Sequence, residues 1–153
     1  MTKLALLNTR ATPDTAEETA RRQDLVALAD RGQFKGVTPR LLPMFLHEAR
    51  LSDEALVEAV RAMAERVGKD AFIRQQKAIM VRPDSHPTLA TIRCPTLVLC
   101  GREDVLTPVV SHREMAAGIS DSRLEVIESC DHLSPLERPE QVNSALRQWL
   151  EAH

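Results

Sequence analysis

The stretch that decides the fold reads Cys94-Pro95-Thr96-Leu97-Val98-Leu99-Cys100-Gly101-Arg102-Glu103-Asp104. Residues 95–100 form an apolar run without a polar face, which is typical of a strand buried in a parallel sheet. Gly101 is the predicted end of this strand. Thr107-Pro108 then begins a predicted helix that runs to about Gly118, because proline is well tolerated in the first turn of a helix.

A strand followed by a helix is predicted a second time further along the chain. Leu124-Glu125-Val126-Ile127 predicts a second strand, and Pro139 begins the last helix. The apolar stripe of that helix recurs at helical spacing and consists of Val142, Ala145, Leu146 and Trp149. A strand–helix–strand–helix order predicts a parallel sheet with right-handed crossovers, so the fold class is α/β.

A third strand is predicted near the start, where residues 3–9 read Lys-Leu-Ala-Leu-Leu-Asn-Thr. Residues 14–82 instead predict successive helices. Their predicted starts are Asp14 with Glu17 as a capping pair, Thr38-Pro39, and Ser52; a fourth helix follows Gly68. The predicted ends are Gly32, Pro43 and Gly68, and Pro83-Asp84-Ser85-His86-Pro87 breaks the helical region.

Composition excludes several classes of function. The chain has 153 residues, of which 43% are hydrophobic and 27% charged, with a formal net charge of −2, as in an ordinary folded globular protein. Aromatic residues are only 3%, which argues against base-stacking platforms, and no basic field exists to bind nucleic acid or an anionic membrane. Apolar runs are too short to span a bilayer, and the start does not resemble a signal peptide. Three cysteines, an odd number, indicate free thiols, so we expect a cytoplasmic protein.

Two titratable residues follow the predicted strands. Asp104 lies four residues after Cys100, and His132 lies five residues after Ile127. The carboxyl ends of adjacent parallel strands meet at one edge of the sheet, so their loops can bring a carboxylate to an imidazole. Such a pair is the acid–base half of an acyl-transfer triad. Each residue alone has a simpler interpretation, a turn or cap for the aspartate and a solvated loop for the histidine; the joint placement favours chemistry.

Other candidate residues are weaker. The Cys130 thiol is a possible nucleophile, but loop neighbours of a histidine rarely have attack geometry. His112, Asp131 and His132 lack tight metal-ligand spacing, and we expect His112 on a solvated helix face. No glycine-rich phosphate loop or dinucleotide fingerprint is present, so no cofactor and no metal are predicted.

The two downstream segments resemble one known family. Residues 94–104 with Thr107-Pro108 look like the seventh strand and acid loop of the α/β-hydrolases, and residues 131–140 look like that family's His loop and final helix start. Leu4-Ala5-Leu6-Leu7-Asn8-Thr9 is similar to its sixth strand. The resemblance implies a partial α/β-hydrolase fold with three parallel strands, flanking helices and a helical lid. It divides the chain into a sixth-strand segment (1–13), a lid (14–91) and a core part with the acid and His loops (92–153).

By the family pattern, Asp104 is the triad acid and His132 the base. His47 and His86 then fall on the surface of the lid, and Asp84-Ser85 forms a turn. The implied substrate is a small molecule with a carboxylic ester, a lactone or a cleavable carbon–carbon bond, because the mix of lid and acid loop looks closest to esterases, enol-lactonases and carbon–carbon-bond hydrolases.

Two departures from the family pattern matter. The family expects a Gly-x-Ser-x-Gly nucleophile elbow, but the five glycines, at 32, 36, 68, 101 and 118, bracket no serine at that spacing. The residue before the histidine is commonly glycine, and here it is Asp131. If that position needs a positive φ, Asp131 is strained there, and its carboxylate can shift the pKa of the neighbouring base.

Two hypotheses for function follow. In the first, the chain supplies the triad acid and base of a hydrolase whose serine lies elsewhere, so the isolated chain is inactive. In the second, it is a non-catalytic remnant or fragment that persists by self-association. Both leave Leu4–Leu7 as an apolar edge strand, so we expect a homodimer or larger assembly through this strand and the lid, burying more than about 2,000 Å².

Overall fold

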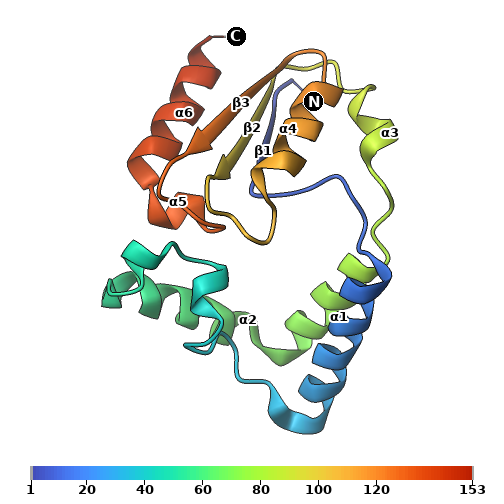
Figure 1. Ribbon diagram of the computed structural model, residues 1–153, viewed down its shortest axis with the longest axis vertical. Coiled ribbons are helices and arrows are strands. Elements are labelled where there is room, and N and C mark those ends of the chain that lie inside the picture. The colour runs from blue at the N-terminus through green and yellow to red at the C-terminus, as the bar shows by residue number, and fades with distance from the viewer. Residues whose placement is uncertain (1, 153) are drawn as a thin grey trace.

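A parallel three-stranded sheet forms the centre of the protein (Figure 1). The computed structural model describes residues 2–152, so Met1 and His153, the outer ends of the first and last predicted segments, lie outside the described residues. The strand order is β1 (Leu4–Leu7), β2 (Thr96–Gly101) and β3 (Ser122–Ile127), with Leu4 opposite Thr96 and Thr96 opposite Ser122. The predicted α/β class with three parallel strands and flanking helices is confirmed.

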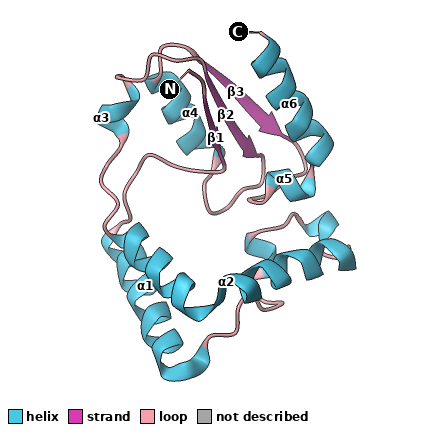
Figure 2. Cartoon of the chain, turned by 180° about the vertical axis from the view of Figure 1, so that it is seen from behind, coloured by secondary structure: helices cyan, strands magenta, loops and turns pink. Residues whose placement is uncertain are grey.

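Helices cover both faces of the sheet (Figures 1 and 2). Leu97 and Leu99 of β2 point to the face covered by α6 (Pro139–Glu151), where Val142, Ala145 and Trp149 are buried as predicted. Val98 points to the opposite face, where it packs with Met115 of α4 (Val109–Gly118) and Leu89 of α3 (His86–Leu89). Because both faces are covered, every residue of β2 is buried, which is why its sequence is continuously apolar.

Residues 14–82 form a helical segment that lies below the carboxyl ends of the strands (Figure 1). It contains α1 (Ala16–Leu28), a π-helical turn η1 (Ala29–Gln33), two 3₁₀ turns η2 (Leu42–Met44) and η3 (Glu48–Arg50), and α2 (Glu54–Met80). Gly32 has φ 79°, which ends the first helical stretch where the sequence predicts it. Gly68, with φ 74° and ψ 174°, interrupts α2, so the predicted third and fourth helices are the two halves of one kinked helix.

The predicted helix starts need correction. Thr15, rather than Asp14, caps α1, and it forms a capping box with Glu18 instead of Glu17. The Asp14 carboxylate, whose side chain is 1% exposed, binds Arg10 and Arg22 instead. Thr15 has the extended backbone of an N-cap, with φ −70° and ψ 166°, and Glu18 lies three residues further on, whereas the Asp14 carboxylate is occupied by the two arginines.

The start of α2 is shifted by one residue, because Asp53 rather than Ser52 accepts the backbone N–H of Leu56. The predicted helix from Thr38-Pro39 does not form, and turns with the short η2 take its place. Pro43 explains the difference, since its ring removes an N–H donor and clashes with the carbonyl four residues earlier.

The segment from Leu42 to Arg50 is fixed to the loop after β3 by three hydrogen bonds. Leu133 donates its N–H to the Phe45 carbonyl at 3.1 Å, and the His47 N–H binds the Glu137 carboxylate at 2.7 Å. The Arg50 guanidinium binds the Glu137 carbonyl at 2.9 Å. The helical segment therefore packs where functional groups of a parallel sheet gather. Within residues 2–152, no helix is both long and apolar enough to cross a membrane.

Candidate active site

Asp104 and His132 are direct neighbours in the structure. Asp104 follows β2 and His132 follows β3, and Nδ1 of the imidazole lies 3.0 Å from Oδ2 and 3.2 Å from Oδ1 of the carboxylate. An ionised carboxylate can only accept hydrogen bonds, so Nδ1 carries the proton and donates it. The predicted proximity of this pair is confirmed; its role in catalysis is taken up below.

Further donors hold the Asp104 carboxylate in place. The backbone N–H groups of Leu106 and Thr107 donate to Oδ1 at 2.9 and 2.8 Å. The Thr107 hydroxyl and the Asn8 amide donate to Oδ2 at 2.6 and 3.0 Å. Burial of Asp104, which is 3% exposed, acts to raise its pKa, but the hydrogen bonds from His132, Asn8 and Thr107 outweigh burial and lower the pKa to about 2. The carboxylate is therefore ionised over the whole range in which an imidazole titrates.

Asp131 differs from what the sequence suggests. Its φ is not positive; among the described non-glycine residues only Asn8 (φ 45°) and Ser129 (φ 53°) are left-handed. The turn into the His loop is thus made two residues before the expected position. Burial and the negative charge of Asp104 raise the pKa of Asp131 to about 6, and its Oδ1 is buried without a hydrogen-bond partner.

A prediction follows for the pH dependence of stability. The Asp131 pKa rises from 3.8 in the unfolded chain to about 6 in the folded one, so its stabilising effect is complete below about pH 4 and is lost as the pH rises through 6. We expect Asp131→Asn to raise the free energy of unfolding by about 1 to 3 kcal/mol at pH 8 and to change it little at pH 4.

Urea denaturation at both pH values measures this difference. Asp121→Asn is the matched control, because Asp121 is exposed. Equal effects of Asp131→Asn at pH 4 and pH 8 would contradict the prediction.

The other candidate residues lie apart from this pair or are blocked. Cys130 is fully buried, and burial together with the nearby Glu137 raises the pKa of its thiol to about 12, which disfavours a thiolate nucleophile. His112 is not on a solvated face: it is 0% exposed, and its Nε2 accepts the backbone N–H of Thr9 at 3.1 Å. Among residues 2–152, no group of three His, Cys, Asp or Glu side chains is arranged to hold a metal.

His47 and His86 are partly exposed in the helical region. The His47 ring accepts the backbone N–H of Ala49, and the His86 ring contacts Asp84 at 2.6 Å, within the predicted turn. Neither forms a hydrogen bond with Asp104 or His132.

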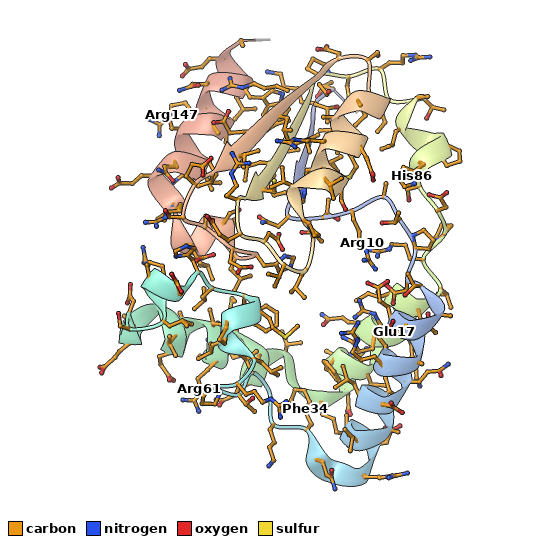
Figure 3. All side chains as sticks on the ribbon, in the orientation of Figure 1. Arg10, Glu17, Phe34, Arg61, His86 and Arg147 are labelled. Atoms are coloured by element: carbon orange, nitrogen blue, oxygen red, sulfur yellow. The ribbon has the colours of Figure 1, made fainter. Side chains whose placement is uncertain are left out.

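A large hollow of about 1,140 Å³ opens beside His132, between the sheet and the helical segment. Its walls are mainly apolar side chains of the helical segment, including Leu25, Leu28, Phe34, Phe45, Val60, Met63 and Phe72. Phe45 approaches the His132 ring with 6.4 Å between ring centroids. Arg10, in the loop between β1 and α1, also lines this space (Figure 3), and its guanidinium is bound to Asp14 and Glu18. The side chain of His132, which is 23% exposed, lies beside this largely apolar space.

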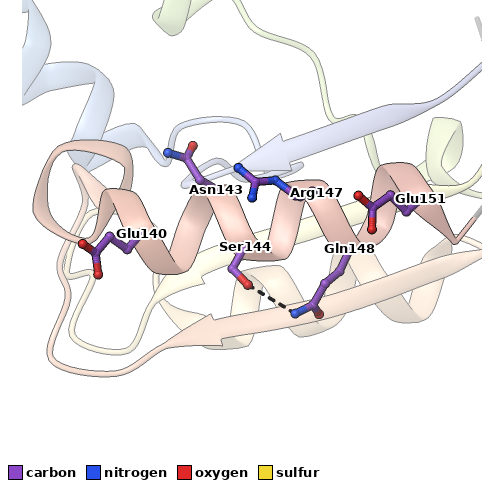
Figure 4. A pocket seen from close by; sticks show the side chains of 6 residues that line it. All are labelled: Glu140, Asn143, Ser144, Arg147, Gln148 and Glu151. Carbon is purple, nitrogen blue, oxygen red and sulfur yellow. Dashed lines mark hydrogen bonds between the residues drawn. The ribbon is translucent and has the colours of Figure 1, made fainter.

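A second, smaller hollow of about 330 Å³ lies on the outer face of α6 (Figure 4). All of its lining residues come from one helix and have polar or charged side chains: Glu140, Asn143, Ser144, Arg147, Gln148 and Glu151. It therefore resembles an ordinary solvated helix face.

Sequence reasoning missed four residues of the site. Asn8 and Thr107 bind the acid, Ser134 binds Asn8, and Glu137 binds the backbone N–H of Asp131. A signal existed for Thr107, since an aspartate followed three residues later by threonine is a common turn motif. The other three residues have partners that are distant in sequence. Asn8 lies 126 residues from Ser134 and 96 from Asp104, and Glu137 lies 90 residues from His47. No local sequence pattern predicts contacts over such separations.

Comparisons with known proteins place the chain in a family. A 2-hydroxy-6-oxononadienedioate/2-hydroxy-6-oxononatrienedioate hydrolase from Klebsiella pneumoniae subsp. pneumoniae is 29% identical over 114 residues, which are 72% of this chain and 40% of that protein. A 2-hydroxy-6-oxo-6-phenylhexa-2,4-dienoate hydrolase from Comamonas testosteroni is 29% identical over 68% of this chain and 37% of its own length. The chain thus spans about two fifths of the length of these curated relatives.

A solved structure and a family model also match this chain. A thermophilic esterase from Thermogutta terrifontis, solved with malate bound, superposes with a TM-score of 0.91 at 30% identity, covering 98% of this chain and 56% of the esterase chain. A model of the Alpha/beta hydrolase family matches residues 5–145, which include most of β1, the Asp104 loop and the His132 loop. With the match extending over most of its length, this chain belongs to the alpha/beta hydrolase family.

Proposed function

We propose that this chain supplies the acid and base of a serine-hydrolase reaction, with Asp104 as the acid and His132 as the base. The observation that carries the proposal is the 3.0 Å contact between His132 Nδ1 and Asp104 Oδ2 at the carboxyl ends of two parallel strands, beside the large apolar hollow. Helices of residues 14–91 form the lid over that hollow.

The geometry supports defined roles for the two residues. With Nδ1 donating to Asp104, the other ring nitrogen, Nε2, is left as a lone-pair acceptor, and within residues 2–152 no hydrogen bond occupies it. Nε2 can take the proton of an attacking hydroxyl and later return it to the leaving group. Asp104 stays ionised because of its hydrogen bonds, so it stabilises the imidazolium formed in between.

The nucleophile belongs to a polypeptide segment outside these 153 residues. The sequence contains no Gly-x-Ser-x-Gly stretch, and Ser134, the serine closest to His132 in sequence, is fully buried and donates to Asn8. We therefore propose that the isolated chain forms no acyl-enzyme and turns over no ester.

The bond cleaved is a carboxylic ester, a lactone or an activated carbon–carbon bond of a small molecule. The Thermogutta terrifontis relative is an esterase. The Klebsiella relative is a 2-hydroxy-6-oxononadienedioate/2-hydroxy-6-oxononatrienedioate hydrolase, and the Comamonas relative is a 2-hydroxy-6-oxo-6-phenylhexa-2,4-dienoate hydrolase. The apolar walls of the hollow fit a substrate with a hydrophobic body.

A chimera tests the proposal. The part of the Thermogutta terrifontis esterase that precedes its match to this chain is fused to residues 1–153, and hydrolysis of a short-chain p-nitrophenyl ester is measured. We expect turnover that is lost in His132→Ala and Asp104→Ala, and in a variant lacking the esterase's own nucleophilic serine. Glu140→Ala, on the exposed face of α6, is the matched control that retains turnover.

Two results would contradict the proposal. One is a chimera that unfolds cooperatively, and so is folded, yet shows no turnover. The other is labelling of a serine in the isolated chain by a fluorophosphonate probe at a rate above that of the denatured chain, which would mean that the nucleophile lies within these residues.

Self-association is a second candidate role. β1 is hydrogen-bonded to β2 on one side only within the described part of the sheet, and Leu25, Leu28 and Val67 on the hollow are 42%, 43% and 47% exposed. We propose a homodimer or larger assembly through β1 and the helical segment, burying more than about 2,000 Å² in total. Sedimentation equilibrium at micromolar concentration tests it, and a folded monomer would exclude it. The three free thiols fit a reducing, cytoplasmic location.

A further inference from the structure

The side chain of Asn8, the first residue after β1, connects three segments that are distant in sequence. Its Nδ2 donates to Asp104 Oδ2 at 3.0 Å and lies 3.4 Å from the carbonyl oxygen of Asp131. Its Oδ1 accepts the hydroxyl of Ser134, a fully buried residue at the start of α5 (Ser134–Glu137). One amide group thus contacts the acid loop, the His loop and the helix that follows.

The hydrogen bonds fix which way this amide points. The Asp104 carboxylate is an acceptor, so only the NH₂ end of the amide can bind it. The Ser134 hydroxyl then donates to the remaining oxygen. Because each end of the amide has a partner of the matching kind, a flipped Asn8 would place two acceptors against each other.

The backbone of Asn8 is shaped for this position. Its N–H donates to the Leu99 carbonyl at 2.9 Å, which extends the pairing of β1 with β2 by one residue. The chain then turns through φ 45°, a left-handed conformation that asparagine tolerates better than most residues. This turn brings the side chain over the end of β2, where the Asp104 loop begins.

We propose that Asn8, with its amide oriented by Ser134, is a positioning residue that aims the Asp104 carboxylate at Nδ1 of His132. A catalytic effect of Asn8 rests on the proposed function. The contacts of Asn8 with Asp104 and Ser134 do not depend on where the nucleophile lies. Of the two carboxylate oxygens, Oδ1 is held by backbone N–H groups, whereas Oδ2 has side-chain donors besides His132, namely Thr107 and Asn8. Asn8 is the one of these two that comes from a different strand.

The hydrogen bond from Asn8 lowers the pKa of Asp104, so a titration of this carboxyl group measures the effect of losing Asn8. Other titratable groups that act on it or sense its charge are His132, Asp131, His112 and Cys100. Asn8→Gly leaves all four of these side chains in the chain and adds no titratable group, so its effect on the Asp104 pKa is compared with that of losing one donor.

The experiment compares variants of the full chain by NMR. Asn8→Gly removes the amide but keeps the left-handed backbone accessible, and Asn8→Asp replaces the donor with a carboxylate of the same shape. Ser134→Ala removes only the group that orients the amide. The matched controls are Asn143→Asp and Ser144→Ala, two exposed positions on α6 (Figure 4). The readouts are the carboxyl titration of Asp104 and the Nδ1 proton resonance of His132.

We expect Asn8→Gly to raise the Asp104 pKa by about one pH unit, Asn8→Asp to raise it further through like-charge repulsion, and Ser134→Ala to raise it less. The His132 Nδ1 proton should exchange faster with water in the same order. Both controls should match the parent chain.

In an active chimera, Asn8→Gly should lower kcat with little change in KM, and a parent-like kcat there would overturn the proposal. An Asp104 titration in Asn8→Gly that matches the parent within about 0.3 would overturn it as well. If Asn8→Asp does not fold, Asn8→Gly and Ser134→Ala still decide the outcome. An inactive chimera with the expected NMR shifts would count against the proposed function while leaving Asn8 as the positioning residue of the pair.

Discussion

Replacing Gly101 with alanine is expected to abolish the folded state or displace the His loop. A Cβ at this position would lie 2.2 Å from the Cys130 carbonyl oxygen, 2.3 Å from that of Asp131 and 2.6 Å from the Cys130 carbonyl carbon. All three atoms are backbone, so no rotation of a side chain can relieve the overlap. The end of β2 and the His loop would have to separate.

The expected loss in the free energy of unfolding is more than about 4 kcal/mol, which is a large part of the stability of a small protein. Two neighbouring hydrogen bonds oppose a separation of β2 from the His loop. The N–H of Glu103 binds the Cys130 carbonyl, and the Glu103 carboxylate accepts the N–H of Cys130 at 2.9 Å. These bonds fix the two loops that carry Asp104 and His132.

Urea denaturation followed by circular dichroism measures the effect. Gly32→Ala is the control: Gly32 also has no side chain, but its φ is 79° and an added Cβ meets nothing within 4 Å. That variant should lose only about 1 to 2 kcal/mol from backbone strain. A Gly101→Ala chain that is as stable as Gly32→Ala would show that the close contact does not restrain the His loop.

Glu137→Ala is expected to have the second-largest effect, because one buried carboxylate joins the His loop to the helical segment. Glu137 is 0% exposed; its Oε1 accepts the N–H of Asp131 at 2.8 Å, and its Oε2 accepts the N–H of His47 at 2.7 Å. Alanine would leave both donors buried and unpaired. At about 1 to 3 kcal/mol for each of the two lost partners, we expect a loss of about 2 to 6 kcal/mol in the free energy of unfolding.

Hydrogen exchange distinguishes this local role from general destabilisation. In Glu137→Ala, the amides of His47 and Asp131 should exchange faster than those in the buried strand β2. Glu140→Ala, three residues further on and exposed, is the matched control and should change neither exchange nor stability. Uniform acceleration of exchange across the sheet would argue against a specific link between the His loop and the helical segment.

Local sequence patterns were sufficient for the sheet and for α4 and α6, but not for α3, which begins within the predicted break at residues 83–87. The continuous apolar run of β2 predicted a strand covered on both faces, and the stripe of Val142, Ala145 and Trp149 predicted the buried face of α6. These features depend on periods of two and 3.6 residues, which each segment carries in itself. The meeting of Asp104 and His132 was also predictable, because parallel strands place their carboxyl ends at one edge.

Only the tertiary structure decided how the pair is supported. His112 looked like a solvated helix residue, yet it is buried because the turn at Asn8 brings the Thr9 N–H to its ring. The amide of Asn8, the hydroxyl of Ser134 and the carboxylate of Glu137 each bind groups up to 126 residues away. Such contacts depend on how the strands and helices pack, and a polar residue in a loop has the same local sequence whether solvent or a buried partner satisfies it. The sequence by itself therefore determined the strands and the meeting of Asp104 with His132, whereas packing determined the hydrogen bonds that hold the two side chains in place.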